Sequence, residues 1–520
     1  MSGKWLANEL AQQIALSPSR RHAPYLILAL GGPLVAGPAS ADGILFVTSS
    51  RYVGTAETIA VGQALPISTG AIAVADGSYP DVFANDTVDG NFGITAPIAL
   101  QVYDVASRGE PDKKPLSLRQ TLNVTAASGV STSFSSKSEL AVNLSTDGKA
   151  LTLMGYVAQP NILDVSNANT PGNVDPTNTD IQTPTYRAVV EIDLTRWRNG
   201  ITATPVNAYS GNNGRAAILA TDVNGSGQHE YLMAGNAGNG SGTEPVDIVN
   251  DTGVQTIVPG STSPDTTVIG APQGTPGTAN GFEYGFAVAQ LGDPADKSGK
   301  DDNLRGLTVA GNTLYVSKGS GGNGINTVYQ VSPGHSGLPL ASDGPTTQIS
   351  ILPGFPTGLA SAISEKSPAT EFYPFGLWFA NATTLYVADE GSQDLNPDPN
   401  AGMQKWIFDG SKWTLAYTIQ AGLNLDQPYG VADYPEQYNP ATTGLRNLTG
   451  FVDGNSVRLF ATTATFSSLG DPGADPNGVV QVVDQLDATA LPAGEAFTTV
   501  VEPRALHVYR GVAYDDSGEG

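Results

Sequence analysis

The chain has 520 residues, including 61 glycines and 36 prolines, and only 14% of its residues are charged. This composition is unusual for a helical protein and typical of many short strands joined by turns. The absence of cysteine excludes disulfides, thiolate metal sites and cysteine nucleophiles. A net charge of −24 disfavours nucleic acids and anionic membrane surfaces as partners, and it suits cationic ligands, calcium or simple solubility.

Residues 1–41 have the features of a secretory signal peptide. Ser19–His22 supplies positive charge, Tyr25–Ala36 is apolar, and Ala39–Ala41 fits the small-x-small cleavage rule. The apolar run is too short to cross a bilayer and contains Pro33. We therefore expect residues 42–520 to form one secreted or periplasmic domain, without a membrane span and monomeric.

Three β-branched and apolar segments begin this domain, namely Ile44–Thr48, Leu100–Val105 and Leu118–Val124. Each has the length and composition of a strand. A group of four such strands follows, with a hairpin turn at Thr146–Gly148. Its strands are predicted at Ser138–Leu144, Leu151–Val157, Ala188–Leu194 and Thr204–Tyr209.

A second group of four strands is predicted at Arg215–Ala220, Glu230–Ala234, Val254–Val258 and, as its outer strand, Phe286–Leu291. An additional group within Pro259–Tyr284 would give seven groups in all. That stretch is rich in proline, glycine and threonine, which favours a loop instead.

The next two groups share a frame of Gly-Leu, a short strand, a turn containing asparagine, and Thr-Leu-Tyr-Val. In the first, Gly311-Asn312 is a tight hairpin signal. Its strands are predicted at Leu304–Val309, Thr313–Ser317, Asn326–Val331 and Thr347–Leu352. In the second, Pro374–Glu390 holds two strands, and Gln404–Phe408 and Trp413–Ile419 supply the others.

The last full group is predicted at Tyr429–Ala432, Val457–Thr462, Val479–Val483 and Phe497–Val501, with an insertion around 436–447. Arg510–Tyr514 then forms a single strand that complements the three at the N-terminus. Groups of four antiparallel strands are the blades of a propeller. We therefore predict an all-β, six-bladed β-propeller whose C-terminal strand pairs with the N-terminal strands, which leaves no open sheet edge. A β-sandwich, the alternative, would not explain the repeated Gly-Leu and Gly-Val starts.

In a propeller, the segments that enter first strands and those that join second to third strands meet around the axis on one face. Arginine there offers planar, bidentate donors for carboxylates or phosphates. The predicted substrate-binding residues are Arg51, Arg215, Arg305, Lys318, Tyr373, Tyr429 and Arg510. Alternatively, the cations pair with acidic residues of the same face and lock neighbouring blades together.

The acidic residues at this face suggest a reaction. Asp389 and Glu390 are candidate calcium ligands, and Glu139 and Asp433 are candidate catalytic bases. The resulting hypothesis is a calcium-assisted hydrolase of ester, lactone or phosphoester bonds in a small or oligomeric anionic ligand. The alternative is a non-catalytic propeller that recognises a protein or a glycan.

Four loops resemble ligand-binding motifs. Asp164–Asp180 and Asp389–Asn400 are rich in the oxygen ligands that calcium prefers, although Asn and Asp are also ordinary turn residues. Gly319–Gly324 matches G-x-G-x-x-G, but a strand follows it, so no helix N-terminus is present to bind a pyrophosphate. Asp222–Gly227 resembles the start of a calcium loop, but Met233 stands where the twelfth-position glutamate is required, which favours a hairpin turn.

The elements Pro-Phe-Gly-Leu at Pro374, Pro-Tyr-Gly-Val at Pro428 and Leu-Tyr-Val-Ala-Asp at Leu385 resemble those of six-bladed propellers of the gluconolactonase, strictosidine-synthase and NHL-repeat superfamily. The resemblance covers the last half of the chain and concerns architecture. It implies a calcium ion near the axis and hydrolysis of lactones or esters. The superfamily's metal ligands have no residue-by-residue match here. The β-propeller phytases are similar in being acidic, secreted and calcium-dependent, but their Asp-Asp-Pro-Ala motif is missing.

Overall fold

The structure is a computed structural model in which the chain divides into two units, Met1–Ser40 and Ala41–Gly520. Only parts of the second unit are described below. They are residues 43–54, 60–62, 93–106, 114–163, 165–178, 183–238, 245–249, 251–270, 302–319, 324–333, 335–358, 360, 371–392, 398–467 and 473–516. No helix in these ranges is long and apolar enough to cross a membrane.

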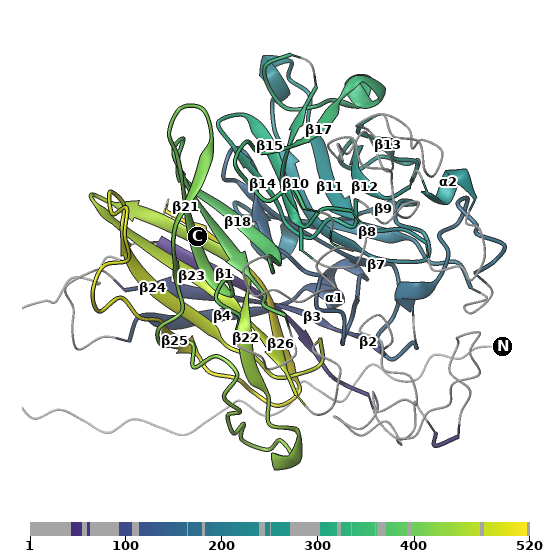
Figure 1. The fold of residues 1–520 in the computed structure, drawn as a ribbon. Coiled ribbons are helices and arrows are strands. Elements are labelled where there is room, and N and C mark those ends of the chain that lie inside the picture. Colours follow the sequence, from purple (N-terminus) through teal and green to yellow (C-terminus); the bar gives the residue numbers. More distant parts are fainter. Residues whose placement is uncertain are drawn as a thin grey trace, which may run out of the picture. The chain divides into compact units, whose positions relative to one another are not determined.

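Within these ranges the strands form six four-stranded antiparallel sheets, the blades of a β-propeller (Figure 1). Blade 1 comprises β26 (His507–Asp515), β1 (Gly43–Arg51), β3 (Ile98–Val105) and β4 (Leu116–Asn123). Blade 2 comprises β6 (Asn143–Leu144), β7 (Ala150–Tyr156), β8 (Arg187–Asp193) and β9 (Ile201–Val206). Blade 3 comprises β10 (Gly214–Ala220), β11 (Glu230–Gly235), β12 (Gly253–Ile257) and β13 (Thr267–Val268).

The other three blades follow in chain order. Blade 4 comprises β14 (Leu307–Ala310), β15 (Thr313–Lys318), β16 (Thr327–Ser332) and β17 (Gln348–Ile351). Blade 5 comprises β18 (Pro374–Asn381), β19 (Thr384–Asp389), β20 (Gly402–Phe408) and β21 (Trp413–Ile419). Blade 6 comprises β22 (Ala441–Asp453), β23 (Ser456–Phe466), β24 (Val479–Gln485) and β25 (Thr498–Val501). A small sheet of β2 (Thr95–Ala96) and β5 (Thr132–Ser133) and the short helices α1 (Val124–Ser128) and α2 (Val246–Val249) are additional elements.

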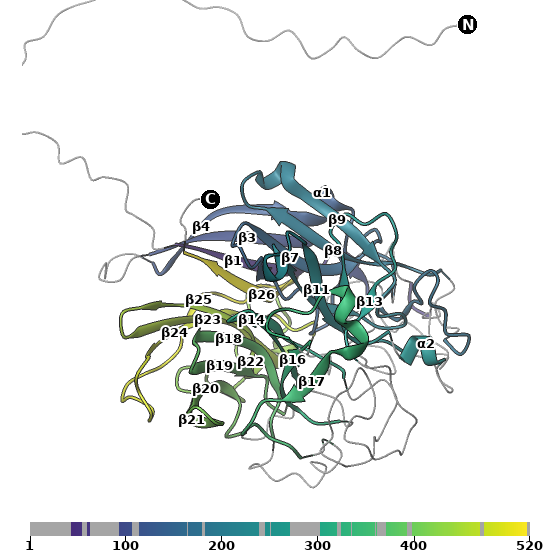
Figure 2. The same ribbon diagram turned by 90° about the horizontal axis from the view of Figure 1, so that it is seen from above.

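Blade 1 closes the ring with strands from both ends of the chain, as predicted. β26 pairs with β1 in antiparallel register from Ile44↔Asp515 to Arg51↔His507. The two strands lie side by side in both views, one purple and one yellow (Figures 1 and 2). β1 is therefore paired on both sides, with β26 and with β3, so neither of its edges is available for pairing with another chain.

The core is divided into layers between neighbouring blades. Side chains alternate along each strand, so one strand contributes to the two layers on either side of its blade. On β1, Ile44 and Phe46 pack against blade 2, whereas Leu45 and Val47 pack against blade 6. Equivalent apolar layers connect blades 2 and 3, 3 and 4, 4 and 5, and 5 and 6, so the apolar contacts run around the whole ring.

The repeated Gly-Leu and Gly-Val starts have a steric cause. A Cβ atom on Gly306 of blade 4 would collide with the Phe375 carbonyl oxygen of blade 5. A Cβ atom on Gly376 of blade 5 would lie 2.7 Å from the Arg446 carbonyl oxygen of blade 6. A Cβ atom on Gly511 would collide with the backbone at Leu140, before blade 2. Glycine is required because neighbouring innermost strands approach each other most closely at this point.

A hydrogen-bond relay connects neighbouring blades at the same level. In blade 4, Gly306 N donates to Ser317 Oγ (2.9 Å), which donates to the Phe375 carbonyl of blade 5 (2.5 Å). In blade 1, Gly511 N donates to Thr48 Oγ1 (2.8 Å), which donates to the Leu140 carbonyl (2.7 Å).

Blade 6 has the same relay, from Asn447 N through Thr462 Oγ1 (3.2 Å) to the Arg510 carbonyl of blade 1 (3.1 Å). The three relays make Arg305, Arg446 and Arg510 structurally equivalent, because each directly precedes the residue whose N–H starts a relay.

Three strand predictions need correction. The outer strand of blade 3 is β13, within the stretch weighed as a seventh blade, whereas the predicted Phe286–Leu291 lies outside the described residues. The first strand of blade 6 is β22, not Tyr429–Ala432, and it includes much of the predicted insertion. β6 pairs only at Asn143–Leu144, because Leu140 adopts a left-handed conformation (φ 63°) and the preceding residues turn into the mouth of the ring.

Candidate functional site

The candidate site lies at the end of the ring axis where the innermost strands begin, called the upper mouth below. Arg215 lies at the start of β10, Arg305 precedes β14, and Arg446 and Arg510 lie within the first half of β22 and of β26. All four are at least 93% buried. Lys137 lies in the segment that leads into β6. These residues gather positive charge in a chain whose net charge is strongly negative.

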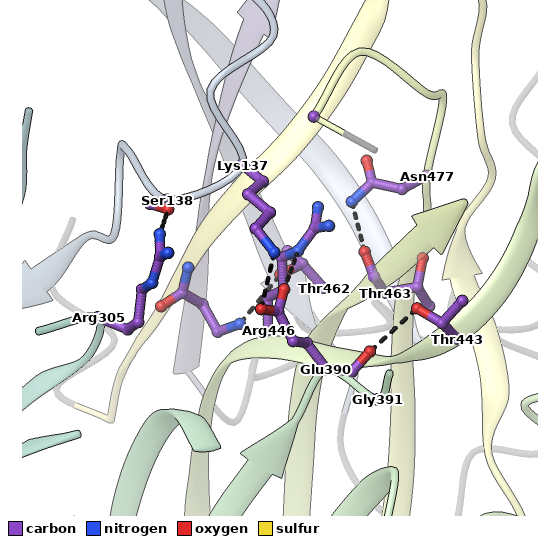
Figure 3. A network of polar contacts seen from close by, with 12 residues as sticks. Lys137, Ser138, Arg305, Glu390, Gly391, Thr443, Arg446, Thr462, Thr463 and Asn477 are labelled. Atoms are coloured by element: carbon purple, nitrogen blue, oxygen red, sulfur yellow. Dashed lines mark hydrogen bonds and ion pairs between the residues drawn. The ribbon is translucent and has the colours of Figure 1, made fainter. Parts of the chain in front are cut away.

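The centre of the upper mouth is an ion-pair cluster around one carboxylate (Figure 3). Lys137 Nζ lies 2.9 Å from Glu390 Oε1, and Arg446 Nε lies 3.2 Å from Glu390 Oε2. Lys137 precedes blade 2, whereas Glu390 directly follows β19 of blade 5 and Arg446 belongs to β22 of blade 6. We call Lys137, Arg305, Glu390 and Arg446 the Glu390 cluster.

Arg305 completes this cluster. Its guanidinium donates to Ser138 Oγ, which connects blade 4 to the segment that leads into blade 2 (Figure 3). Burial lowers the pKa of Arg305 to about 10, with Glu390 opposing the effect and Arg446 adding to it. Burial likewise lowers the pKa of Lys137 to about 8; Glu390 opposes this shift, whereas Arg305 and Arg446 reinforce it.

For Glu390, the neighbouring charges affect the pKa more than burial does. Burial acts to raise its pKa, but the attraction of Lys137, Arg446 and Arg305 outweighs burial and lowers it. Among the described residues, three cations therefore surround one ionised carboxylate.

Glu139, a predicted base, is fully buried within a hydrogen-bond network. Its Oε2 accepts bonds from Thr132 Oγ1 (2.6 Å) and Ser133 N (2.9 Å). Its Oε1 accepts bonds from Tyr156 Oη and from Asn213 Nδ2 (3.3 Å). The four donors hold the carboxylate in a fixed position.

Arg215 is connected to Glu139 through Asn213. Its Nε donates to Asn213 Oδ1 (3.0 Å), and its Nη1 donates to Asn303 Oδ1 and to the Leu304 carbonyl (2.7 Å). Burial lowers the pKa of Arg215 well below its usual value, and neighbouring Arg305 adds to this shift. Arg215 therefore joins blade 3 to blade 4 and extends the positive region of the Glu390 cluster.

Arg510 connects three parts of the ring. Its Nη2 donates to the Phe134 carbonyl (2.5 Å), in the segment leading to blade 2, and to the Gly473 carbonyl (2.6 Å), in the β23–β24 connection of blade 6. These are contacts to backbone oxygens, as expected of a residue that locks blades together. The cations of the upper mouth are therefore engaged by groups of neighbouring blades.

The other predicted binding residues lie in different surroundings. Arg51 ends β1 and is exposed, whereas Lys318 ends β15, is fully buried and donates to Asn326 Oδ1 (2.9 Å). Tyr373 is partly buried, and its backbone N donates to Asp389 (2.9 Å). Tyr429 is also partly buried, and its hydroxyl donates to the Pro476 carbonyl (2.8 Å). Asp433, a predicted base, lies in an exposed turn with φ 60°.

Asp389 and Glu390 do not fit the predicted calcium site. Asp389 Oδ1 accepts from Gly391 N (2.9 Å), and Oδ2 accepts from Tyr373 N (2.9 Å) and Gln404 Nε2 (3.2 Å). Burial raises the pKa of Asp389 well above its usual value, and Asp398 adds to the shift. The Glu390 carboxylate forms ion pairs with Lys137 and Arg446. In the described part of the chain, no three Asp, Glu or His side chains are grouped to hold a metal ion.

Sequence reasoning missed Arg446, which fell in the supposed insertion. Its context, Leu445-Arg446-Asn447-Leu448, repeats Leu304-Arg305-Gly306-Leu307, and this similarity would have placed it at the mouth. A second missed pattern is Asp-Pro-Asn, found at Asp398 and again at Asp475, before the third strands of blades 5 and 6. Both aspartates are at least 95% buried. Burial raises the pKa of Asp475 to about 7, although bonds from Ser467 and Tyr434 oppose the shift.

The fold and the site define a six-bladed β-propeller with a cationic upper mouth, the architecture that the sequence resemblance implies. No protein-family model matches the chain, and a search of curated proteins finds no match. Among solved structures, the chain is similar to the periplasmic gluconolactonase of Pseudomonas aeruginosa. The identity is 10%, the TM-score is 0.33, and the match covers 90% of this chain and 99% of that one.

Two further solved structures are similar at the same level. One is a sialidase of Trypanosoma rangeli, with 10% identity, a TM-score of 0.32, and coverage of 80% of this chain and 53% of that one. The other is a GH74 enzyme of Niastella koreensis, with 11% identity, a TM-score of 0.30, and coverage of 78% of this chain and 44% of that one. Similarities this low transfer neither a site nor a reaction to this chain.

Proposed function

We propose that this propeller binds an anionic ligand, small or oligomeric, at its upper mouth. The observation that carries the proposal is the Glu390 cluster, in which two buried arginines and the partly buried Lys137 surround one carboxylate. Arginine recognises carboxylate and phosphate groups through paired N–H donors. Lys137 retains 19% side-chain exposure, more than the other ion-paired members, so an anion would reach the cluster through it.

The binding proposal is tested with a panel of anions that includes phosphate, sulfate, a sugar acid and an oligomeric uronate. Affinities are measured calorimetrically for the full chain and for Lys137→Gln and Arg446→Gln. Loss of one charge-assisted bond is expected to weaken binding about tenfold or more. Arg119→Gln is the matched control, because Arg119 lies on the outer strand β4 of blade 1, pairs with Asp104 of β3, and has a side chain that is 32% exposed. Equal affinity of Lys137→Gln and the unmodified chain would overturn the proposal.

Hydrolysis of an ester, lactone or phosphoester of the bound anion is the reaction that we propose for this site. Glu139 supports it, because Asn213 joins this carboxylate to Arg215 of the cationic region. Glu139 would orient the attacking water or accept a proton from it. No step is assigned to calcium, since Asp389 and Glu390 are engaged by other partners.

Turnover is measured on a panel of lactones, esters and phosphoesters, with calcium and with a chelator. The hydrolase proposal predicts activity that Glu139→Gln abolishes, while anion affinity is retained. Activity lost on chelation would support a calcium requirement met elsewhere in the chain. Anion binding without any turnover would instead support the non-catalytic propeller, an alternative favoured by the many internal bonds of the upper-mouth side chains.

We also propose that the protein is exported, on the basis of the leader-like residues 1–41. N-terminal sequencing of protein recovered outside the cytoplasm is expected to begin at Asp42. An intact Met1 on the recovered protein would contradict this proposal.

A further inference from the structure

A cavity of about 450 Å³ opens at the other end of the axis, called the lower end below. All six blades line it, through their innermost strands and the hairpins that follow two of them. The residues that matter here are Asn143, Thr308, Asn312, Trp378, Thr449 and Tyr514. The volume lies within the range of small-molecule sites, roughly 300–1,000 Å³.

The described lining of this cavity contains no charged side chain. It consists of amides, hydroxyls, short apolar groups, one indole and one phenol. The same strands carry the cations of the upper mouth a short distance away, since Arg446 precedes Thr449 by three residues, roughly 10 Å of strand. The described lining offers no charge to compensate an ionic ligand. A neutral ligand with many hydroxyl groups could instead form hydrogen bonds with the amide and hydroxyl side chains.

Several lining groups are held in place by neighbouring blades. Asn143 Nδ2 donates to the Ala217 carbonyl of blade 3 (3.0 Å). Thr449 Oγ1 accepts from Tyr514 N of blade 1 (3.1 Å). The Trp378 ring packs against the Tyr386 ring, with centroids 6.1 Å apart. Groups that are fixed before binding lose little conformational entropy when a ligand arrives.

We propose that this cavity binds a neutral saccharide. Amide and hydroxyl side chains would pair with sugar hydroxyls, and the Trp378 ring would pack against the apolar C–H face of a sugar ring. The proposal is independent of the anion site, because it depends on a different set of side chains at the opposite end of the axis.

The test measures binding of neutral mono- and oligosaccharides, such as glucose, galactose, xylose and maltotriose, to the full chain by ligand-observed NMR and calorimetry. Glucuronate and sulfate are the charged comparison probes. Saturable binding of a neutral sugar is expected, weakened at least tenfold in Trp378→Ala. Trp197→Phe is the control, because Trp197 packs on Phe46 between blades 1 and 2 and does not line the cavity.

Thr308→Val provides a second variant that removes one hydroxyl from a partly exposed position without changing its shape, so a folding defect of Trp378→Ala would not block the test. It is expected to weaken sugar binding severalfold. Absence of saturable binding by any neutral sugar would overturn the proposal. Sugar binding that is unaffected in both lower-end variants, or that is lost in Arg446→Gln, would overturn it as well, because the sugar would then occupy another site.

Discussion

The two ends of the ring axis are built from the same six innermost strands and differ in their chemistry. At the upper mouth, where the strands begin, buried arginines and Lys137 surround Glu390. At the lower end, the described lining of the cavity is uncharged. The backbone arrangement is shared, so the difference comes from residues only a few positions apart along each strand.

The two ends of the axis therefore differ in how stability and ligand binding are linked. The upper-mouth side chains bond to backbone and side-chain groups of other blades, so they both hold the ring together and carry charge. At the lower end, Asn143 and Thr449 also bond to neighbouring blades, but the described lining is uncharged and encloses an open volume. Substitutions at the upper end are therefore expected to alter stability and anion binding together, whereas those at the lower end should alter the binding of a neutral ligand without altering anion binding.

The largest effect is expected from Glu390→Gln. Removing the carboxylate leaves Lys137, Arg305 and Arg446 buried without it, and breaking a buried ion pair in this way costs about 3–5 kcal/mol. Denaturant unfolding measures the loss. Sulfate should restore more stability to this variant than to the unmodified chain, because the anion replaces the missing charge.

Asp104→Asn is the control for Glu390→Gln, since the Arg119–Asp104 pair is about one-third exposed and should contribute at most about 1 kcal/mol. A Glu390→Gln protein as stable as this control would show that the upper mouth is not held together by its charges.

A backbone substitution tests the closure of the ring. In Gly511→Ala, the new Cβ atom would meet the backbone at Leu140 and Val142, and we expect a loss of about 1–3 kcal/mol or more. Gly430→Ala is the matched control, because a Cβ atom there meets nothing within 4 Å. Thermal unfolding compares the two variants. Equal melting temperatures would contradict the close approach of blades 1 and 2 at this point.

A pH titration distinguishes the two ends. Burial lowers the pKa of Lys137 to about 8, so its charge is expected below that pH and is lost above it. Anion affinity should fall roughly tenfold between pH 7 and pH 9 as this charge-assisted bond is lost. Sugar affinity at the lower end should not change. In Lys137→Met the anion affinity should be low at both pH values; a persisting tenfold fall would assign the titration to another group.

The last prediction concerns the pH dependence of stability. Burial raises the pKa of Asp475 to about 7 and that of Asp251 to about 8, so the folded state holds protons that the unfolded state releases near pH 4. Stability from these groups is therefore fully present below about pH 4 and is lost as pH rises towards 7 and 8. Melting temperatures should be higher at pH 5 than at pH 8, and Asp475→Asn should reduce the difference. An unchanged difference would exclude Asp475 as a contributor.

Much of this architecture follows from local sequence. Strands that start with Gly-Leu or Gly-Val were identified because the close approach between blades demands glycine there, as at Gly306 and Gly511. β22 was missed because polar residues, among them Thr442 and Arg446, interrupt its apolar pattern, while Tyr429-Gly-Val imitates a strand start. β13 pairs through only two residues, too few to give a pattern.

That these loops meet at one end of the axis was also predictable, because strand order alone determines which loops meet there. The partners of the individual side chains at this end of the axis were not predictable from the sequence. Lys137 and Glu390 are 253 residues apart in sequence, and their contact depends on how segments of several blades fold over the axis. The alternation of strands gives no information about such cross-axis contacts.

The pairing of β26 with β1 has a consequence for biosynthesis. Blade 1 lacks its innermost strand until residues 507–515 have been translated, so the ring cannot close before that point in synthesis. All the other described strands precede β26 in the chain. Closure of the ring is therefore the last pairing between these strands that synthesis allows.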